Sequence, residues 1–120
     1  GHIAVISSIA GTKGLGIAPA YSATKRFQNT YIDALSQLSK MEKAGVCFTD
    51  IKPGFVDTNL LSGGGNYPLL MQPRKVALVI EKVLRRKQNR IIIDWKYKIL
   101  VFFWRLIPSQ LWRNLPVKNK

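Results

Sequence analysis

The sequence has little of what most metal sites and nucleophilic triads require. Its 120 residues contain a single cysteine, Cys47, and a single histidine, His2. A lone cysteine excludes an intramolecular disulfide and a zinc site built on several thiolates. A lone histidine leaves little for a histidine-based metal site or a Ser-His-Asp triad. We therefore expect a functional site without a metal ion.

Acidic residues are also scarce, and the imbalance is local. The chain has 19 lysines and arginines against 6 acidic residues, a net charge of +13. Residues 74–120 hold 13 of the basic residues and two of the acidic ones. A strongly basic chain favours nucleic acid, an anionic membrane or an anionic small molecule as a partner. Because the excess is concentrated after residue 73, it characterises the C-terminal part rather than the whole chain.

Long hydrophobic runs and an N-terminal leader are missing. The uncharged run Ile99–Trp104 in the aromatic C-terminal part is far shorter than the ~20 apolar residues that span a bilayer. The chain begins with Gly1 and His2 instead of Met and has no signal-peptide pattern. We expect a cytoplasmic protein, with association at a membrane surface as an alternative. We also expect the sequence to be part of a longer protein.

Short apolar runs alternate with segments of helical periodicity. The pattern predicts strands over 3–6, 46–51 and 91–93, and helices over 20–43, 73–87 and 95–107. The run Ile3–Ile6 has the continuous apolar character of a strand buried on both faces. This alternation is typical of a parallel α/β sheet. Three strands would leave the first with an unpaired edge, so we predict a partial sheet whose N-terminal half is missing.

Three residues near the first predicted strand form a candidate catalytic group. Tyr21 and Lys25 are four residues apart at the start of a predicted helix, so they share a face. Ser8 follows the strand, at the end where open α/β sheets bind ligands. A nearby ammonium favours the phenolate form of a tyrosine, which can then exchange a proton with an alcohol. Taken singly, these residues are also typical of a packed aromatic, a solvated charge and a capping serine.

Three motifs in order carry a family resemblance. They are Ile6–Gly11 (ISSIAG), Tyr21–Lys25 (YSATK) and Pro53–Thr58 (PGFVDT), with Ser8 placed 13 residues before Tyr21. With these motifs the chain closely resembles the C-terminal half of the short-chain dehydrogenase/reductase family, strongly over 1–58 and loosely beyond. The resemblance implies a partial Rossmann-like, doubly wound parallel sheet. Residues 1–94 would form the C-terminal half of that domain, and residues 95–120 a basic, aromatic helical extension.

The resemblance also implies roles for individual residues. Tyr21 resembles the general acid/base of the family, Lys25 the residue that binds the nicotinamide ribose and favours the phenolate, and Ser8 the residue that orients the substrate oxygen. Four positions resemble the turn and hydroxyl beside the nicotinamide: Pro53, Gly54, Val56 and Thr58. The glycine-rich segment Gly11–Gly16 falls where the family has a substrate-side loop, so we interpret it as a connector rather than a phosphate-binding loop.

The function implied is hydride transfer between a nicotinamide cofactor and a carbonyl or alcohol, with a hydrophobic substrate. NAD and NADP both fit, with NADP slightly favoured, and a homodimer through the helix bearing Tyr21 is a partner that the family suggests. The family's pyrophosphate loop, cofactor selector and catalytic asparagine would precede Gly1, so we expect the chain alone to be inactive. An alternative is a non-catalytic remnant that acts as an interaction or membrane-surface module.

The basic, aromatic segment 95–115 allows three interpretations. We favour a helix that packs on the sheet, on the substrate lid that the family has after the Pro53-Gly54 turn, or on a second subunit, with its charges in water. A peripheral membrane contact is the second, because aromatic and basic residues on one helix suit a bilayer interface. Nucleic-acid binding is the least favoured, since no recognised binding motif accompanies the charges.

Overall fold

The computed structural model describes residues 1–54, 70–93 and 95–115. In chain order the elements are β1 (His2–Ile6), the 3-10 helix η1 (Ile9–Thr12), α1 (Pro19–Met41), β2 (Cys47–Lys52), α2 (Pro73–Arg86), β3 (Arg90–Ile92), α3 (Trp95–Leu106) and α4 (Ser109–Asn114). The predicted alternation of strands and helices is confirmed, with boundaries shifted by one or two residues. The short helix α4, beyond the predicted stop at Pro108, was not expected.

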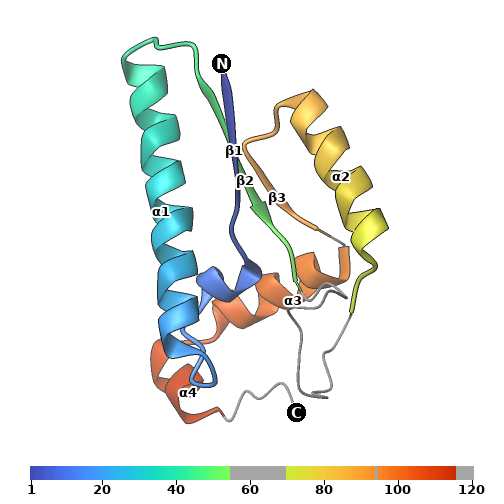
Figure 1. Cartoon of the computed structure of the whole chain (residues 1–120). Coiled ribbons are helices and arrows are strands. Elements are labelled where there is room, and N and C mark those ends of the chain that lie inside the picture. Colours follow the sequence, from blue (N-terminus) through green and yellow to red (C-terminus); the bar gives the residue numbers. More distant parts are fainter. Residues whose placement is uncertain (55–69, 94, 116–120) are drawn as a thin grey trace.

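The three strands form one parallel sheet in the order β1-β2-β3. His2 lies opposite Cys47 in the first pair, and Ile51 lies opposite Ile91 in the second. Helices α1 and α2 lie on opposite sides of the sheet, and α3 runs across the end where the strands finish (Figure 1). The α/β class and the partial, Rossmann-like parallel sheet are therefore as predicted.

Strand β1 differs from the prediction that both of its faces are buried. Ile3 and Ile6 are 49% and 56% exposed. Within the described residues β1 pairs only with β2, so its other edge has no neighbouring strand and its side chains gain little cover. An apolar strand with a free edge is a surface that folded proteins normally cover.

The apolar core lies where the sheet meets α2 and α3. Tyr97 of α3 is fully buried, and Ile51 of β2 is 1% exposed. The buried residues of this cluster come from η1, β2 and the C-terminal half of the chain: Ile9, Ile51, Met71, Val76, Ile93, Tyr97 and Val101. The start of α3 is thus part of the same core as the sheet.

Helix α1 places its apolar residues on the side that faces away from the sheet. Pro19 occupies the first turn, where its missing N–H costs nothing. The residues buried along the helix are Ser22, Asn29 and Ile32. The periodic apolar positions are instead open to solvent, at 67% for Phe27, 54% for Tyr31, 49% for Leu38 and 70% for Met41.

Helices α3 and α4 are tied to the loop that joins η1 to α1. The indole Nε1 of Trp104 donates to the Oγ1 of Thr12 at 2.8 Å, and Nζ of Lys13 donates to the Ile107 carbonyl at 2.8 Å. Trp112 donates from Nε1 to the carbonyl of Gly14 at 2.5 Å. These bonds join segments about 90 residues apart in sequence. No helix in the described part of the chain is both long and apolar enough to cross a membrane.

Candidate active site

Ser8 connects β1 to η1. The residue is 7% exposed and takes the N-cap position of η1, where its Oγ accepts a hydrogen bond from the Ala10 amide at 3.1 Å. A serine oxygen that accepts one bond keeps its O–H for donation. The capping bond fixes the side chain, and the hydroxyl can still donate to a substrate oxygen.

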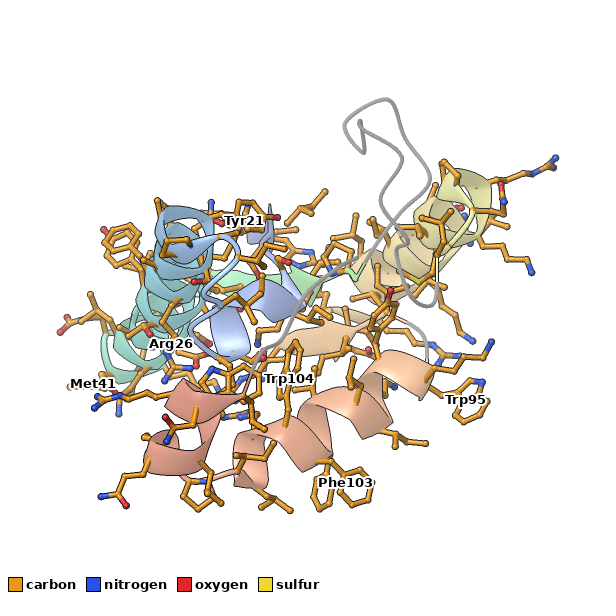
Figure 2. The ribbon with its side chains drawn as sticks, turned by 90° about the horizontal axis from the view of Figure 1, so that it is seen from below. Tyr21, Arg26, Met41, Trp95, Phe103 and Trp104 are labelled. Atoms are coloured by element: carbon orange, nitrogen blue, oxygen red, sulfur yellow. The ribbon has the colours of Figure 1, made fainter. Side chains whose placement is uncertain are left out.

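Tyr21 and Lys25 lie together on the first two turns of α1. The Lys25 Nζ is 5.5 Å from the centroid of the Tyr21 ring, and Tyr21 is 48% exposed. Figure 2 shows Tyr21 on the side of the molecule away from α3. The arrangement puts a cation beside a phenol that solvent, and therefore a substrate, can reach.

Gly11 allows η1 to approach α1 closely at the turn that carries Lys25. A Cβ added at Gly11 would lie 2.7 Å from the carbonyl carbon of Lys25 and 2.8 Å from the backbone N of Arg26. Real Cβ atoms do not come so near to backbone, so a larger residue would push the two helices apart. Gly11 thereby controls how near the helix capped by Ser8 comes to Tyr21 and Lys25. The sequence analysis did not include Gly11 among the site residues, although it lies in the ISSIAG motif.

The connector between η1 and α1 is held at its far end by Ser22. The Ser22 Oγ donates to the Pro19 carbonyl at 3.1 Å and accepts from the Leu15 amide at 3.1 Å. Together with the bond from Trp112 to Gly14, this fixes the path of the chain between Ser8 and Tyr21. Ser22 is buried, and the sequence alone does not show its role, because its partner Leu15 lies seven residues away.

The Pro53-Gly54 turn lies against η1 and α3. The carbonyl of Pro53 accepts a hydrogen bond from the Ile9 amide at 3.2 Å. A Cβ at Gly54 would overlap the ring of Tyr97, so the turn packs closely on α3. The structure therefore brings Ser8, the start of α1 and the Pro53-Gly54 turn to one end of the sheet. The predicted cofactor residues Val56 and Thr58 lie outside the described residues.

Ser7, the residue before Ser8, belongs to a buried polar cluster with Asp50 and Lys52. The Ser7 hydroxyl donates to Oδ1 of Asp50, whose Oδ2 lies 3.4 Å from Nζ of Lys52. The Asp50 side chain is fully buried, and that of Lys52 is 11% exposed. A charge in such a place is tolerated because an opposite charge and hydrogen bonds accompany it. The sequence analysis missed this cluster, although two charged residues within the short strand CFTDIK are unusual.

The site offers donors for an oxygen-bearing substrate and no metal cluster. In the described ranges no group of three or more histidine, cysteine, aspartate or glutamate residues could hold a metal ion. The side chains available are a phenol, an ammonium and a hydroxyl. Such a set suits proton exchange with an alcohol or carbonyl and binding of ribose hydroxyls.

Comparison with known proteins shows which sequences this chain resembles. A family model described as short chain dehydrogenase matches residues 1–64. An uncharacterized oxidoreductase of Myxococcus xanthus is 30% identical over 113 residues, which cover 92% of this chain and 44% of that protein. The dehydrogenase/reductase SDR family member 7B of Mus musculus is 31% identical, over 94% of this chain and 38% of that protein.

A solved structure shares the fold. 4-Hydroxyisoleucine dehydrogenase complexed with NADH superposes with a TM-score of 0.53 at 21% identity, over 78% of this chain and 44% of that one. The chain thus spans less than half the length of the relatives described here.

Proposed function

The chain belongs to the short-chain dehydrogenase family, and from that premise we propose that it supplies the catalytic tyrosine, lysine and serine of an NAD(P)-dependent oxidoreductase. The reaction would interconvert a carbonyl and an alcohol on a hydrophobic substrate. The observation that carries the proposal is the Lys25 ammonium held 5.5 Å from the exposed Tyr21 ring, beside the helix that Ser8 caps.

Tyr21, Lys25 and Ser8 have separate roles in the proposed reaction. In the reducing direction the Tyr21 hydroxyl donates its proton to the carbonyl oxygen as the carbon becomes an alcohol. Lys25 stabilises the phenolate that remains, because an adjacent positive charge favours the ionised phenol. Ser8 donates a hydrogen bond to the same substrate oxygen and fixes its position. In the oxidising direction the proton returns to Tyr21.

The residues present fit a nicotinamide dinucleotide. An ammonium beside an exposed phenol offers the donors and acceptors that ribose hydroxyls need. The Pro53-Gly54 turn, which is packed on Tyr97 and bonded to Ile9, gives a fixed backbone at the same end of the sheet. When bound, the cofactor supplies or accepts the hydride. Our proposal includes NAD and NADP, with NADP slightly favoured.

We propose that the chain is the C-terminal part of a longer protein, and the test uses that longer protein. We expect it to bind NADPH or NADH at micromolar concentration, followed by cofactor fluorescence. Tyr21→Phe should lower turnover by about 10²- to 10⁴-fold, the range that a positioned general acid contributes, while cofactor binding changes little. Tyr31→Phe, which changes another exposed tyrosine of α1, is the matched control and should leave turnover unchanged.

Two results would contradict the proposal. Unchanged turnover in Tyr21→Phe would remove this residue from the reaction. Failure of the longer protein to bind either cofactor at millimolar concentration would favour the non-catalytic alternative. For the 120-residue chain alone we expect no turnover.

The outer side of α1 supports a homodimer as part of the same proposal. Phe27 and Tyr31 stack at 5.7 Å between ring centroids, and both are more than half exposed. Exposed apolar stripes on helices commonly mark contacts with other proteins. Sedimentation velocity should show self-association that Phe27→Ser with Tyr31→Ser abolishes; a monomer at all concentrations would contradict this part.

A further inference from the structure

Helix α3 presents an apolar face to solvent, which we call the outer face of α3. It consists of five residues that are each 48–66% exposed: Trp95, Ile99, Phe102, Phe103 and Leu106. At 100° per residue they form one stripe along the helix. Figure 2 shows Trp95 and Phe103 pointing away from the rest of the molecule. A surface helix normally turns polar residues to water, so this face requires a separate explanation.

The opposite side of α3 fixes this orientation. Tyr97 and Val101 are 0% and 2% exposed and belong to the core. Trp104 points inward, toward η1 (Figure 2), and donates its hydrogen bond to Thr12. The helix cannot turn its outer face inward without removing these side chains from the core. The apolar outer face is therefore a fixed feature of the fold.

Basic residues border the outer face. On the helical wheel Lys96 lies on one flank, and Lys98 and Arg105 lie on the other. Segment 95–115, which contains α3 and α4, includes one further basic residue, Arg113, and no acidic residue. The face is thus an apolar, aromatic stripe with positive charge on both sides.

We propose that the outer face of α3 docks on the surface of an anionic membrane. Aromatic and aliphatic side chains enter the boundary between headgroups and acyl chains, and lysine and arginine at its margin reach anionic headgroups. A helix of 12 residues is about 18 Å long. This length suits a helix that lies in the plane of the interface. The inference concerns α3 alone and is independent of the oxidoreductase proposal.

Charge favours a membrane over a second copy of the chain on this face. Two copies that met through α3 would bring Lys98 and Arg105 of each near the same residues of the other. Segment 95–115 offers no acidic partner for them, and like charges in an interface oppose association. An anionic lipid surface supplies the opposite charge.

The experiment is co-sedimentation of the full 120-residue chain with phosphatidylcholine vesicles, with and without phosphatidylserine. We expect binding that requires phosphatidylserine and weakens with salt. Phe102→Ser with Phe103→Ser should reduce the partition coefficient at least about tenfold. The control Ile17→Ser with Leu78→Ser removes two exposed apolar residues that lie outside α1 and α3 and should bind like the parent chain.

A second pair of variants tests the charges. Lys98→Glu with Arg105→Glu should abolish the preference for phosphatidylserine. The same charge change on α2, Lys82→Glu with Arg86→Glu, should retain that preference. Circular dichroism verifies that each variant keeps the parent's helix content.

Three results would overturn the inference. They are equal binding to both vesicle types, equal losses in the α3 aromatic variant and its control, and a dimer in solution that only the α3 variant dissociates. The last would identify a second copy as the occupant. Vesicle binding, the effects of the variants and the oligomeric state do not depend on whether the longer protein is an active oxidoreductase.

Discussion

Near its C-terminal end, strand β2 buries a charged side chain on one face and an apolar side chain on the other. Asp50 projects toward the side of α1, where Phe48 lines a hollow with Ile32. Its neighbour Ile51 projects to the other side and joins the apolar core with Tyr97. Asp50 and Ile51 are almost equally buried, at 0% and 1% exposure. Burial alone therefore does not distinguish Asp50 from Ile51, whereas the polarity of each side chain and of its partners does.

This difference between Asp50 and Ile51 indicates that the two side chains have different structural roles. The apolar face contributes stability through non-directional burial. On the other face, Asp50 accepts a hydrogen bond from Ser7 and forms an ion pair with Lys52, and both interactions are costly to leave incomplete. Ser7 precedes the proposed catalytic Ser8. We infer that the side chains around Asp50 hold the backbone at Ser8 in position in addition to contributing to stability, whereas those around Ile51 contribute to stability alone.

The largest expected effect comes from Asp50→Ala. It leaves the Lys52 ammonium buried without its partner, which typically costs about 3–5 kcal/mol. The free energy of unfolding, measured in urea, should fall by this amount. Asp50→Asn combined with Lys52→Met removes both charges and should lie within about 1 kcal/mol of the parent. Equal losses in the single and double variants would show that the ion pair is not the cause.

A smaller effect is expected from Gly11→Ala. The new methyl would meet the backbone of α1 at Lys25, and such overpacking costs about 1–3 kcal/mol. In the longer protein, turnover should fall further than stability accounts for, because Ser8 moves relative to Tyr21. Gly14→Ala is the matched control, since nothing lies within 4 Å of its Cβ position. Comparable losses in both variants would contradict the steric argument.

The smallest effect is expected on the apolar face. Ile51→Val removes one methyl group from the core and should cost about 0.5–1.5 kcal/mol. Turnover of the longer protein at a temperature well below unfolding should be unchanged. A marked fall in turnover would mean that the apolar face also positions the site, and the contrast between the two faces would fail.

The sequence predicts the helices and strands well, because the spacing of apolar residues and the positions of glycine and proline act locally. The helices predicted over 20–43 and 73–87 and the three predicted strands all correspond to elements of the structure. The exposure of Ile3 and Ile6 was mispredicted, because an apolar run looks the same whether or not a neighbouring strand covers it. The orientation of α1 depends likewise on what packs against it.

The candidate site was predicted only where a motif marks it. Ser8, Tyr21 and Lys25 follow from motif spacing, and the structure confirms that Tyr21 and Lys25 adjoin. The steric roles of Gly11 and Gly54 could not be predicted, because the atoms they make room for belong to other elements. The catalytic and cofactor-binding roles of the predicted site residues stay predictions: Ser8, Tyr21, Lys25, Pro53, Gly54, Val56 and Thr58.

The bonds between the C-terminal helices and the connector have a consequence for exchange between relatives. Trp112 donates to a backbone carbonyl of Gly14, and Lys13 donates to that of Ile107 while lying 5.4 Å from the Trp112 ring centroid. Each segment thus depends on the other's side chain. A chimaera that takes residues 12–16 from one relative and residues 104–112 from another would lose these bonds wherever it replaces Lys13, Trp104 or Trp112. We therefore expect that the two segments can be exchanged only together, although 87 residues of sequence separate their nearest ends.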